Sequence, residues 1–340
     1  MYPQVLGLAA TFQPELARAM TTAIRKQLLA IGARQGLAPV LDIGRDARWG
    51  RIEETFGEDP TLASHFGVAY VQGLQGESLE QGVIATGKHF IGHSFSLGGL
   101  NCAPVHLGLQ DLYNVYLAPF HAAIRDAGLG SIMNSYPELD GEVVAASSHI
   151  LTTLLRETLG FQGLVVSDYN AVIMLHNYHF VAEDISKAAC LALQAGIDVE
   201  LPATECYGAA LKAALQAGDI QLEALDQAVS RHLHKKFELG LFDNPYVPEE
   251  NILDVFESQE NRALARQIAR QSMVLLKNDG LLPLNKSVPT LAVIGPNAGQ
   301  GRCLLGDYSY AAMRELMAFQ ALADPQVLHL KDAAPALHSI

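Results

Sequence analysis

Short apolar runs alternate with longer amphipathic stretches over the first 240 residues of the chain. Short runs between turn residues are typical of buried strands, and apolar residues at every third or fourth position are typical of helices. Strands that alternate with helices indicate β/α units around a parallel sheet. The predicted strands are "GLAPVLDIG" (36–44), "VIATGKHF" (83–90), "SIMNSY" (131–136), "GLVVSDY" (163–169) and "GIDVELP" (196–202).

The segments between these runs predict helices with recognisable ends. In the segment 13–32, Pro14 suits a first helical turn and Gly32 suits the end of the helix. Asp59 precedes Pro60 and is predicted to be an N-cap. A later apolar stripe predicts one more helix and is expected to lie in the core; it consists of Leu222, Leu225, Val229, Leu233 and Phe237.

The pattern changes after residue 240. The stretch "LFDNPYVPEENILDVFES" has two prolines and no clear period, which is typical of a linker. A helix around 264–272 follows, and "PTLAVIGPNA" is predicted to be a strand that ends in a turn. We therefore predict a domain at 1–240, a linker at 241–260 and the beginning of a second α/β domain at 261–340.

Composition narrows the class of protein. The hydrophobic fraction of 49% is enough for a large core, and the net charge of −13 disfavours binding to nucleic acid or to an anionic membrane. The four cysteines lie far apart, so neither a disulfide framework nor a metal site is expected, and we predict no cofactor. No apolar run approaches the roughly 20 residues of a membrane helix. We expect a soluble protein that binds a small polar ligand.

The predicted strands turn polar at their carboxyl ends, where both β/α barrels and open α/β sheets bind ligands. These polar residues are Asp42, Arg45 and Arg51 after the first strand, Lys88 and His89 at the second, Asn134 and Tyr136 at the third, Asp168 at the fourth and Glu200 at the fifth. No glycine-rich phosphate loop of the dinucleotide or P-loop kind occurs in the chain. We therefore favour a (β/α)8 barrel over an open nucleotide-binding sheet.

Asp168 is the strongest candidate for chemistry, because Arg51, Lys88, His89 and Tyr136 would converge on it. Nearby cations favour an ionised carboxylate, so we expect a lowered pKa, which suits a nucleophile. The alternative is a structural ion pair or a helix cap. Simpler roles are also expected for other polar residues: a solvated charge cluster for Arg45, Asp46 and Arg48, loop and cap positions for Glu53, Glu54, Glu58 and Asp59, and no metal site at His89 and His93.

Lys88 and His89 pose a geometric problem. Neighbours on a regular strand point to opposite faces of the sheet, so the two side chains cannot both reach one ligand. We therefore predict an irregular backbone at this point.

Several long motifs, in order, resemble glycoside hydrolase family 3 and especially its bacterial β-glucosidases. They are "APVLDIGRDARWGRIEETFGEDP", "GKHFIGH", "APVHLGLQDLYNVYLAPFHAAI", "GLVVSDYNAV", "KFELGLFDNPYV" and "SMVLLKNDGLLPL". The resemblance implies a retaining exo-glycosidase built from a (β/α)8 barrel and an α/β sandwich, acting on terminal β-glucosyl residues. It also implies Asp168 as the nucleophile and Arg51, Lys88, His89, Tyr136 and Met133 as residues that bind or border the sugar.

The resemblance also has departures. In the family the first barrel strand precedes the stretch that opens this chain, and no acid/base motif of the second domain is found before Ile340. Five predicted strands are too few for a closed barrel of eight. We therefore expect a member truncated at both ends, with its first strand and its acid/base outside the chain. Any export signal would also precede this start, which leaves the compartment open.

Three alternatives remain open at this stage. One is a β-xylosidase of the same family, because a single pocket contact distinguishes the two sugars. Another is a catalytically incomplete carbohydrate-binding fragment. The third is an aldolase that uses Lys88. Assembly of the chain with copies of itself is also left open, and the expected ligand is a small β-glucoside or an oligosaccharide.

Overall fold

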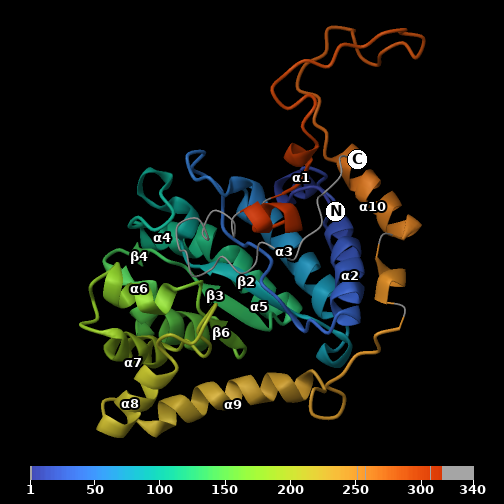
Figure 1. Cartoon of the computed structure of the whole chain (residues 1–340). Helices are drawn as coiled ribbons and strands as arrows, with labels where there is room; N and C mark the ends of the chain where they lie inside the picture. The colour runs from blue at the N-terminus through green and yellow to red at the C-terminus, as the bar shows by residue number, and fades with distance from the viewer. Residues whose placement is uncertain (1, 251, 257, 307, 316–340) are drawn as a thin grey trace. The chain divides into compact units, whose positions relative to one another are not determined.

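The computed structural model describes residues 2–250, 252–256, 258–306 and 308–315 (Figure 1). The chain divides into two compact units, one formed by residues 2–273 and the other by the residues from Val274 onwards. Among the described residues, no helix combines the length and the hydropathy needed to cross a membrane.

A four-stranded parallel sheet lies in the middle of the first unit. Its strands are β1 (Gln35–Gly36), β2 (Ile84–Phe90), β3 (Ser131–Asn134) and β6 (Leu164–Val166), in the spatial order β1-β2-β3-β6. A parallel bridge from Val166 to Val199 places the fifth predicted strand beside β6. The α/β class with a parallel sheet is therefore confirmed, and the described part of the sheet is open rather than closed into a barrel.

Helices surround this sheet, and their order follows the predicted alternation (Figure 1). The α-helices are α1 (Val5–Ala9), α2 (Pro14–Ala30), α3 (Pro60–Gln75), α4 (Leu109–Asp111), α5 (Ala118–Ala127), α6 (Ala171–Asn177), α7 (Ile185–Ala195), α8 (Ala209–Ala217), α9 (Leu222–Glu238) and α10 (Gln259–Gln271). Two segments are π-helical, Leu112–Tyr116 and His149–Thr158, and a small hairpin joins β4 (Glu138–Leu139) to β5 (Glu142–Val143).

The predicted helix ends are confirmed. Pro14 occupies the first turn of α2, and Gly32 follows that helix with a φ of 77°, which a glycine adopts without a steric penalty. The Asp59 carboxylate accepts a hydrogen bond of 2.7 Å from the backbone N–H of Leu62 and so caps α3. These local signals determine where α2 and α3 begin, and the two helices pack against each other.

The prediction that the apolar stripe of α9 lies in the core is wrong for most of its residues. The helix is present, but Leu222, Val229, Leu233 and Phe237 are 41–64% exposed rather than buried, whereas Leu225 of the same stripe is partly buried against the core. The opposite side of the helix, with Ala228 and Arg231, faces the rest of the unit, because the Arg231 guanidinium forms an ion pair with the fully buried carboxylate of Asp198. This ion pair orients the helix with its stripe away from the described core.

The second unit has a short helical turn at Gly301–Leu304 and no strand among its described residues. The strand predicted at "PTLAVIGPNA" is therefore absent from the described structure. A strand needs a hydrogen-bonded neighbour, and the apolar residues Leu291, Val293 and Ile294 are exposed without one. The boundaries 1–240, 241–260 and 261–340 stay predictions; α10 packs on α1 and α2 in the first unit.

Candidate active site

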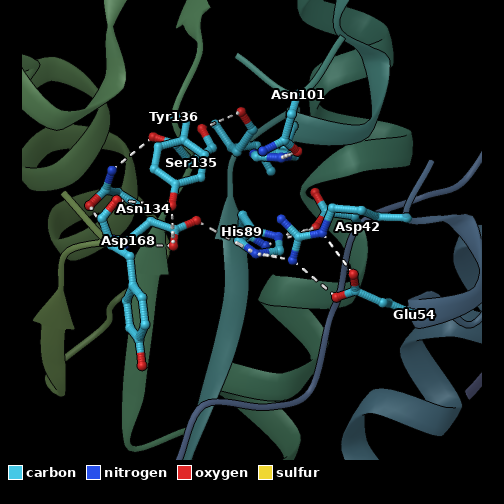
Figure 2. A network of polar contacts seen from close by, with 12 residues as sticks. Asp42, Glu54, His89, Asn101, Asn134, Ser135, Tyr136 and Asp168 are labelled. Carbon is cyan, nitrogen blue, oxygen red and sulfur yellow. Dashed lines mark hydrogen bonds and ion pairs between the residues drawn. The ribbon is translucent and has the colours of Figure 1, made fainter. Parts of the chain in front are cut away.

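Polar side chains from separate segments meet at the carboxyl ends of the central strands (Figure 2). Asp168 lies just after β6, Tyr136 just after β3, and Lys88 and His89 lie within β2. Arg51 comes from the loop before a 3₁₀ turn at Ile52–Glu54. Parallel strands place these ends on one edge of the sheet, which explains why positions so far apart in sequence converge.

The two carboxylate oxygens of Asp168 have different environments. Oδ1 accepts hydrogen bonds from the Tyr136 hydroxyl at 2.9 Å and from the Tyr169 backbone N–H at 2.7 Å. Oδ2 is buried and has no hydrogen-bond partner, and Nε2 of His89 lies 3.7 Å from it. The carboxylate is thus held by one oxygen, while the other has no hydrogen-bond partner.

The electrostatics of Asp168 contradict the sequence-based expectation. Burial raises the pKa of its carboxyl above the ordinary value, and this effect exceeds the opposing effects of the Tyr169 N–H, the Tyr136 hydroxyl and the cations Arg51 and Lys88. The expectation of a lowered pKa counted the cations and left out the loss of water around a side chain that is only 7% exposed.

His89 connects this carboxylate to a second one. Its ring Nδ1 lies 2.8 Å from Oδ2 of Asp42, and its Nε2 lies 2.9 Å from a guanidinium nitrogen of Arg51. Burial, with smaller contributions from Arg51 and Lys88, lowers the pKa of His89 well below its ordinary value. The ring is therefore neutral at physiological pH.

Arg51 is positioned by Glu54, which the sequence analysis had placed among loop and cap residues. The guanidinium makes two hydrogen bonds to the Glu54 carboxylate, at 2.7 and 3.0 Å, and lies over the Trp49 ring at 5.8 Å from its centroid. A two-pronged pair of this kind orients the guanidinium as well as neutralising it. Glu54 is only 7% exposed, so its role is to hold Arg51 rather than to cap a helix at the surface.

The predicted irregularity in β2 is confirmed. The pairing of β2 with β3 shifts register between Gly87 and Phe90, so regular pleating stops where Lys88 and His89 occur. The Lys88–His89 and Phe90–Ile91 peptide bonds are both cis. Both side chains are buried, Lys88 at 8% and His89 at 1% exposure. Burial is also the main cause of the lowered pKa of Lys88.

Other polar residues support the site from behind. The Asn134 amide oxygen lies 3.4 Å from the Asp168 backbone N–H, and Tyr136 has a raised pKa, mainly because it is buried and beside Asp168. His93 stacks on His89 with ring centroids 4.6 Å apart and bonds to Asn101. The described residues contain no group of three or more His, Cys, Asp or Glu side chains arranged to hold a metal ion.

Two strand-end residues take other positions. Met133 is buried in β3, where it pairs with Val166 of β6. The Glu200 carboxylate accepts hydrogen bonds from the backbone N–H groups of Cys206 and Tyr207, so it organises a loop. Sequence reasoning missed the positioning roles of Asp42 and Glu54; for Asp42, the available signal was a carboxylate inside an otherwise apolar run.

Comparison with known proteins identifies relatives of both parts of the chain. Residues 1–234 match the family model "Glycosyl hydrolase family 3 N terminal domain", and residues 273–333 match the model of the C-terminal domain of the same family. A β-xylosidase of Formosa agariphila is 39% identical over 91% of this chain and 44% of its own length. A periplasmic β-glucosidase of Salmonella typhimurium is 36% identical over 92% of this chain and 41% of its own length.

Solved structures agree with these matches. A β-glucosidase from Erythrobacter marinus superimposes with a TM-score of 0.81 at 38% identity, over 84% of this chain and 38% of that chain. A β-glucosidase of Listeria innocua in complex with laminaribiose gives a TM-score of 0.80 at 33% identity, over 83% and 40% of the two chains. The chain thus spans about two fifths of the length of the relatives that it matches.

Proposed function

Because the chain belongs to glycosyl hydrolase family 3, we propose that it is part of a retaining, exo-acting β-glycosidase and that it supplies the catalytic nucleophile. The proposed reaction is hydrolysis of terminal, non-reducing β-D-glucosyl residues through a covalent glycosyl-enzyme intermediate on Asp168. No metal or cofactor takes part in this proposal.

The observation that carries the proposal is the unpartnered Oδ2 of Asp168. A nucleophilic carboxylate needs one oxygen free to reach the anomeric carbon and a fixed orientation for the other. Tyr136 and the Tyr169 N–H hold Oδ1, while Oδ2 is buried without a partner. A carboxylate with a purely structural role would be expected to have both oxygens paired, as both oxygens of Asp198 are.

The neighbouring side chains have the chemistry needed to bind a sugar. Arg51 and Lys88 can donate hydrogen bonds to hydroxyl oxygens, and His89 holds the Arg51 guanidinium through Nε2. In this proposal Tyr136 keeps the nucleophile in place, and Met133 supplies apolar surface behind it. Because these groups are buried, each sugar hydroxyl that enters the site needs a hydrogen-bond partner there. A sugar whose hydroxyls point elsewhere leaves buried groups unpaired, so the site favours one sugar configuration over another.

A retaining glycosidase also needs a proton donor about 5 to 5.5 Å from the nucleophile. Two other carboxylates of the described site are already engaged, Asp42 with His89 and Glu54 with Arg51. We therefore assign neither of them to proton donation, and no residue of this chain is proposed as the acid/base.

The preferred sugar is proposed to be glucose, with xylose as the second candidate. The solved relatives from Listeria innocua hold glucose and laminaribiose, which favours a glucosyl substrate. The β-xylosidase of Formosa agariphila is just as similar in sequence as the β-glucosidases, which favours the alternative.

Covalent trapping tests the proposal. A 2-deoxy-2-fluoro-β-glucoside with an activated leaving group needs little acid assistance, so Asp168 Oδ2 bonds to the anomeric carbon as the bond to the leaving group breaks. We expect a fluoroglucosyl adduct on the Asp168 peptide by mass spectrometry, and none in Asp168→Asn. Faster labelling by the matching xyloside would make the chain part of a β-xylosidase. A folded protein that no probe labels would rule out the enzymatic proposal and favour a carbohydrate-binding role.

A further inference from the structure

The carboxylate of Asp42 determines where His89 carries its proton. Asp42 is 3% exposed, and one of its oxygens, Oδ2, accepts from both the His89 backbone N–H at 2.9 Å and the His89 ring Nδ1 at 2.8 Å (Figure 2). A ring nitrogen that bonds to a carboxylate acts as the donor, so Nδ1 carries the proton. Because the backbone N–H uses the same oxygen, the ring is fixed in orientation as well as in tautomer.

The contact at the second ring nitrogen, Nε2, requires the same tautomer. Nε2 lies 2.9 Å from a guanidinium nitrogen of Arg51, and a guanidinium only donates hydrogen bonds. Nε2 is therefore a bare acceptor. Lys88 and Asp168 also face the ring, and His93, whose pKa burial lowers to about 3, is neutral and stacks on its face.

The location of this proton matters for the carboxylate across the pocket. In the other tautomer the proton would sit on Nε2, which lies 3.7 Å from Oδ2 of Asp168. A small movement would bring the two into a charge-assisted hydrogen bond. That bond would occupy the one oxygen of Asp168 that has no partner and would draw electron density from it.

We propose that Asp42 is a positioning residue that keeps the His89 proton on Nδ1 and so leaves Oδ2 of Asp168 without a hydrogen bond, as nucleophilic attack requires. The inference rests on the proposed function in one respect, since it takes Asp168 to be the nucleophile. The tautomer itself is independent of that function.

Two substitutions separate the hydrogen bond from the charge. In Asp42→Asn the backbone N–H of His89 still needs an acceptor, so the amide turns its oxygen, and not its NH2 group, toward His89. The same oxygen accepts from the ring, and the Nδ1–H tautomer is retained. Asp42→Leu has a similar shape and no acceptor, so an Nδ1–H would be buried without a partner. We then expect the proton to move to Nε2, which gives up its hydrogen bond from Arg51, still held by Glu54, and donates to Asp168 instead. Asp46→Asn is the control for loss of a nearby charge, since Asp46 pairs with Arg48 at the surface of the same loop.

Nitrogen-15 NMR of histidine-labelled protein reads the tautomer directly, with the His89 signals assigned by their absence from His89→Gln. At pH 7 we expect neutral Nδ1–H signals in wild type, Asp42→Asn and Asp46→Asn, and Nε2–H signals in Asp42→Leu. An Nε2–H or imidazolium His89 in the wild type or in Asp42→Asn overturns the proposal, even when Asp42→Leu does not fold. A folded Asp42→Leu whose His89 keeps Nδ1–H overturns it as well, because Arg51 alone would then hold the tautomer.

The rate at which the 2-deoxy-2-fluoroglucoside labels Asp168 measures how the His89 tautomer affects the reactivity of this carboxylate. We expect a loss of about tenfold or more in Asp42→Leu, a rate within about threefold of wild type in Asp42→Asn, and no change in Asp46→Asn. Equal rates for wild type and a folded Asp42→Leu whose His89 carries Nε2–H would overturn the inference. An unlabelled wild type with the expected tautomer contradicts the proposed function alone.

Discussion

At the scale of the single residue, Asp168 illustrates how burial and charge compete. Its surroundings contain two cations and two hydrogen-bond donors that favour the ionised form, yet burial has the larger effect and raises its pKa. A carboxyl group whose folded-state pKa is raised makes the fold less stable as pH rises above the ordinary value. The ionised form of Asp168 is therefore a cost to stability.

This cost predicts that Asp168→Asn is more stable than wild type at pH 7. The raised folded-state pKa means that the native state loses stability as pH rises from the ordinary value of 3.8 through the folded pKa. An amide avoids that loss and can keep the acceptor for Tyr136. We expect a rise in the thermal midpoint of about 2–4 °C, the usual effect of about 1 kcal/mol on domains of this size.

The pH dependence provides the control. The gain in thermal midpoint of Asp168→Asn over wild type should shrink as pH falls. It should vanish below about pH 3.8, where Asp168 is protonated in both the folded and the unfolded state. Thermal scans of both proteins by circular dichroism at several pH values measure it. A gain that is the same at pH 3.5 and pH 7 would show that charge burial is not its cause.

At the scale of secondary-structure elements, Asp198 joins three of them. Its carboxylate accepts from the backbone N–H of Val165 in β6, from Arg156 in the second π-helical segment and from Arg231 in α9. The side chain has no exposed surface. This cluster explains why α9 presents Ala228 inward and its apolar stripe outward.

We predict that Asp198→Ala lowers the free energy of unfolding by about 3–5 kcal/mol, because it leaves the buried guanidinium of Arg156 without its counter-charge. Urea unfolding followed by circular dichroism measures the loss. Asp126→Ala is the control, since it breaks an exposed pair with Arg125, and it should leave the midpoint unchanged. Equal effects of the two substitutions would contradict the role given to the cluster.

At the scale of the whole molecule, the first compact unit extends past the irregular segment that follows α9. Ile268 of α10 is fully buried, and α10 packs against α1 and α2 from the beginning of the chain. The Gln27 side chain also reaches the backbone carbonyl of Val255. Segments from opposite ends of the unit therefore share one core.

This arrangement predicts the result of a single cut after Tyr246, which is 84% exposed on the irregular segment. Brief chymotrypsin treatment should cleave there, and the two fragments should stay together because α10 remains packed on α1 and α2. Size-exclusion chromatography under native conditions should show one peak, and in denaturant two. Separation of the fragments without denaturant would mean that α10 does not belong to the first unit.

The sequence by itself determined the features that depend on near neighbours. The buried strands β2, β3 and β6 follow from their apolar runs, whereas the runs at 36–44 and 196–202 form only a two-residue strand and isolated bridges. The start of α2 at Pro14 and the cap of α3 at Asp59 follow from backbone chemistry within a few residues. The irregularity at Lys88 and His89 followed from strand alternation, because two neighbours cannot face one ligand on a regular strand.

Only the tertiary structure decided the features that depend on desolvation and on contacts between distant segments. The pairing of Asp42 with His89 spans 47 positions, and the outward stripe of α9 depends on Arg231 reaching Asp198. The direction of the Asp168 pKa shift depends on how much water the folded chain removes, which no local pattern encodes. Local chemistry thus placed the carboxylate at the end of its strand, and packing determined its charge, its orientation and its free oxygen.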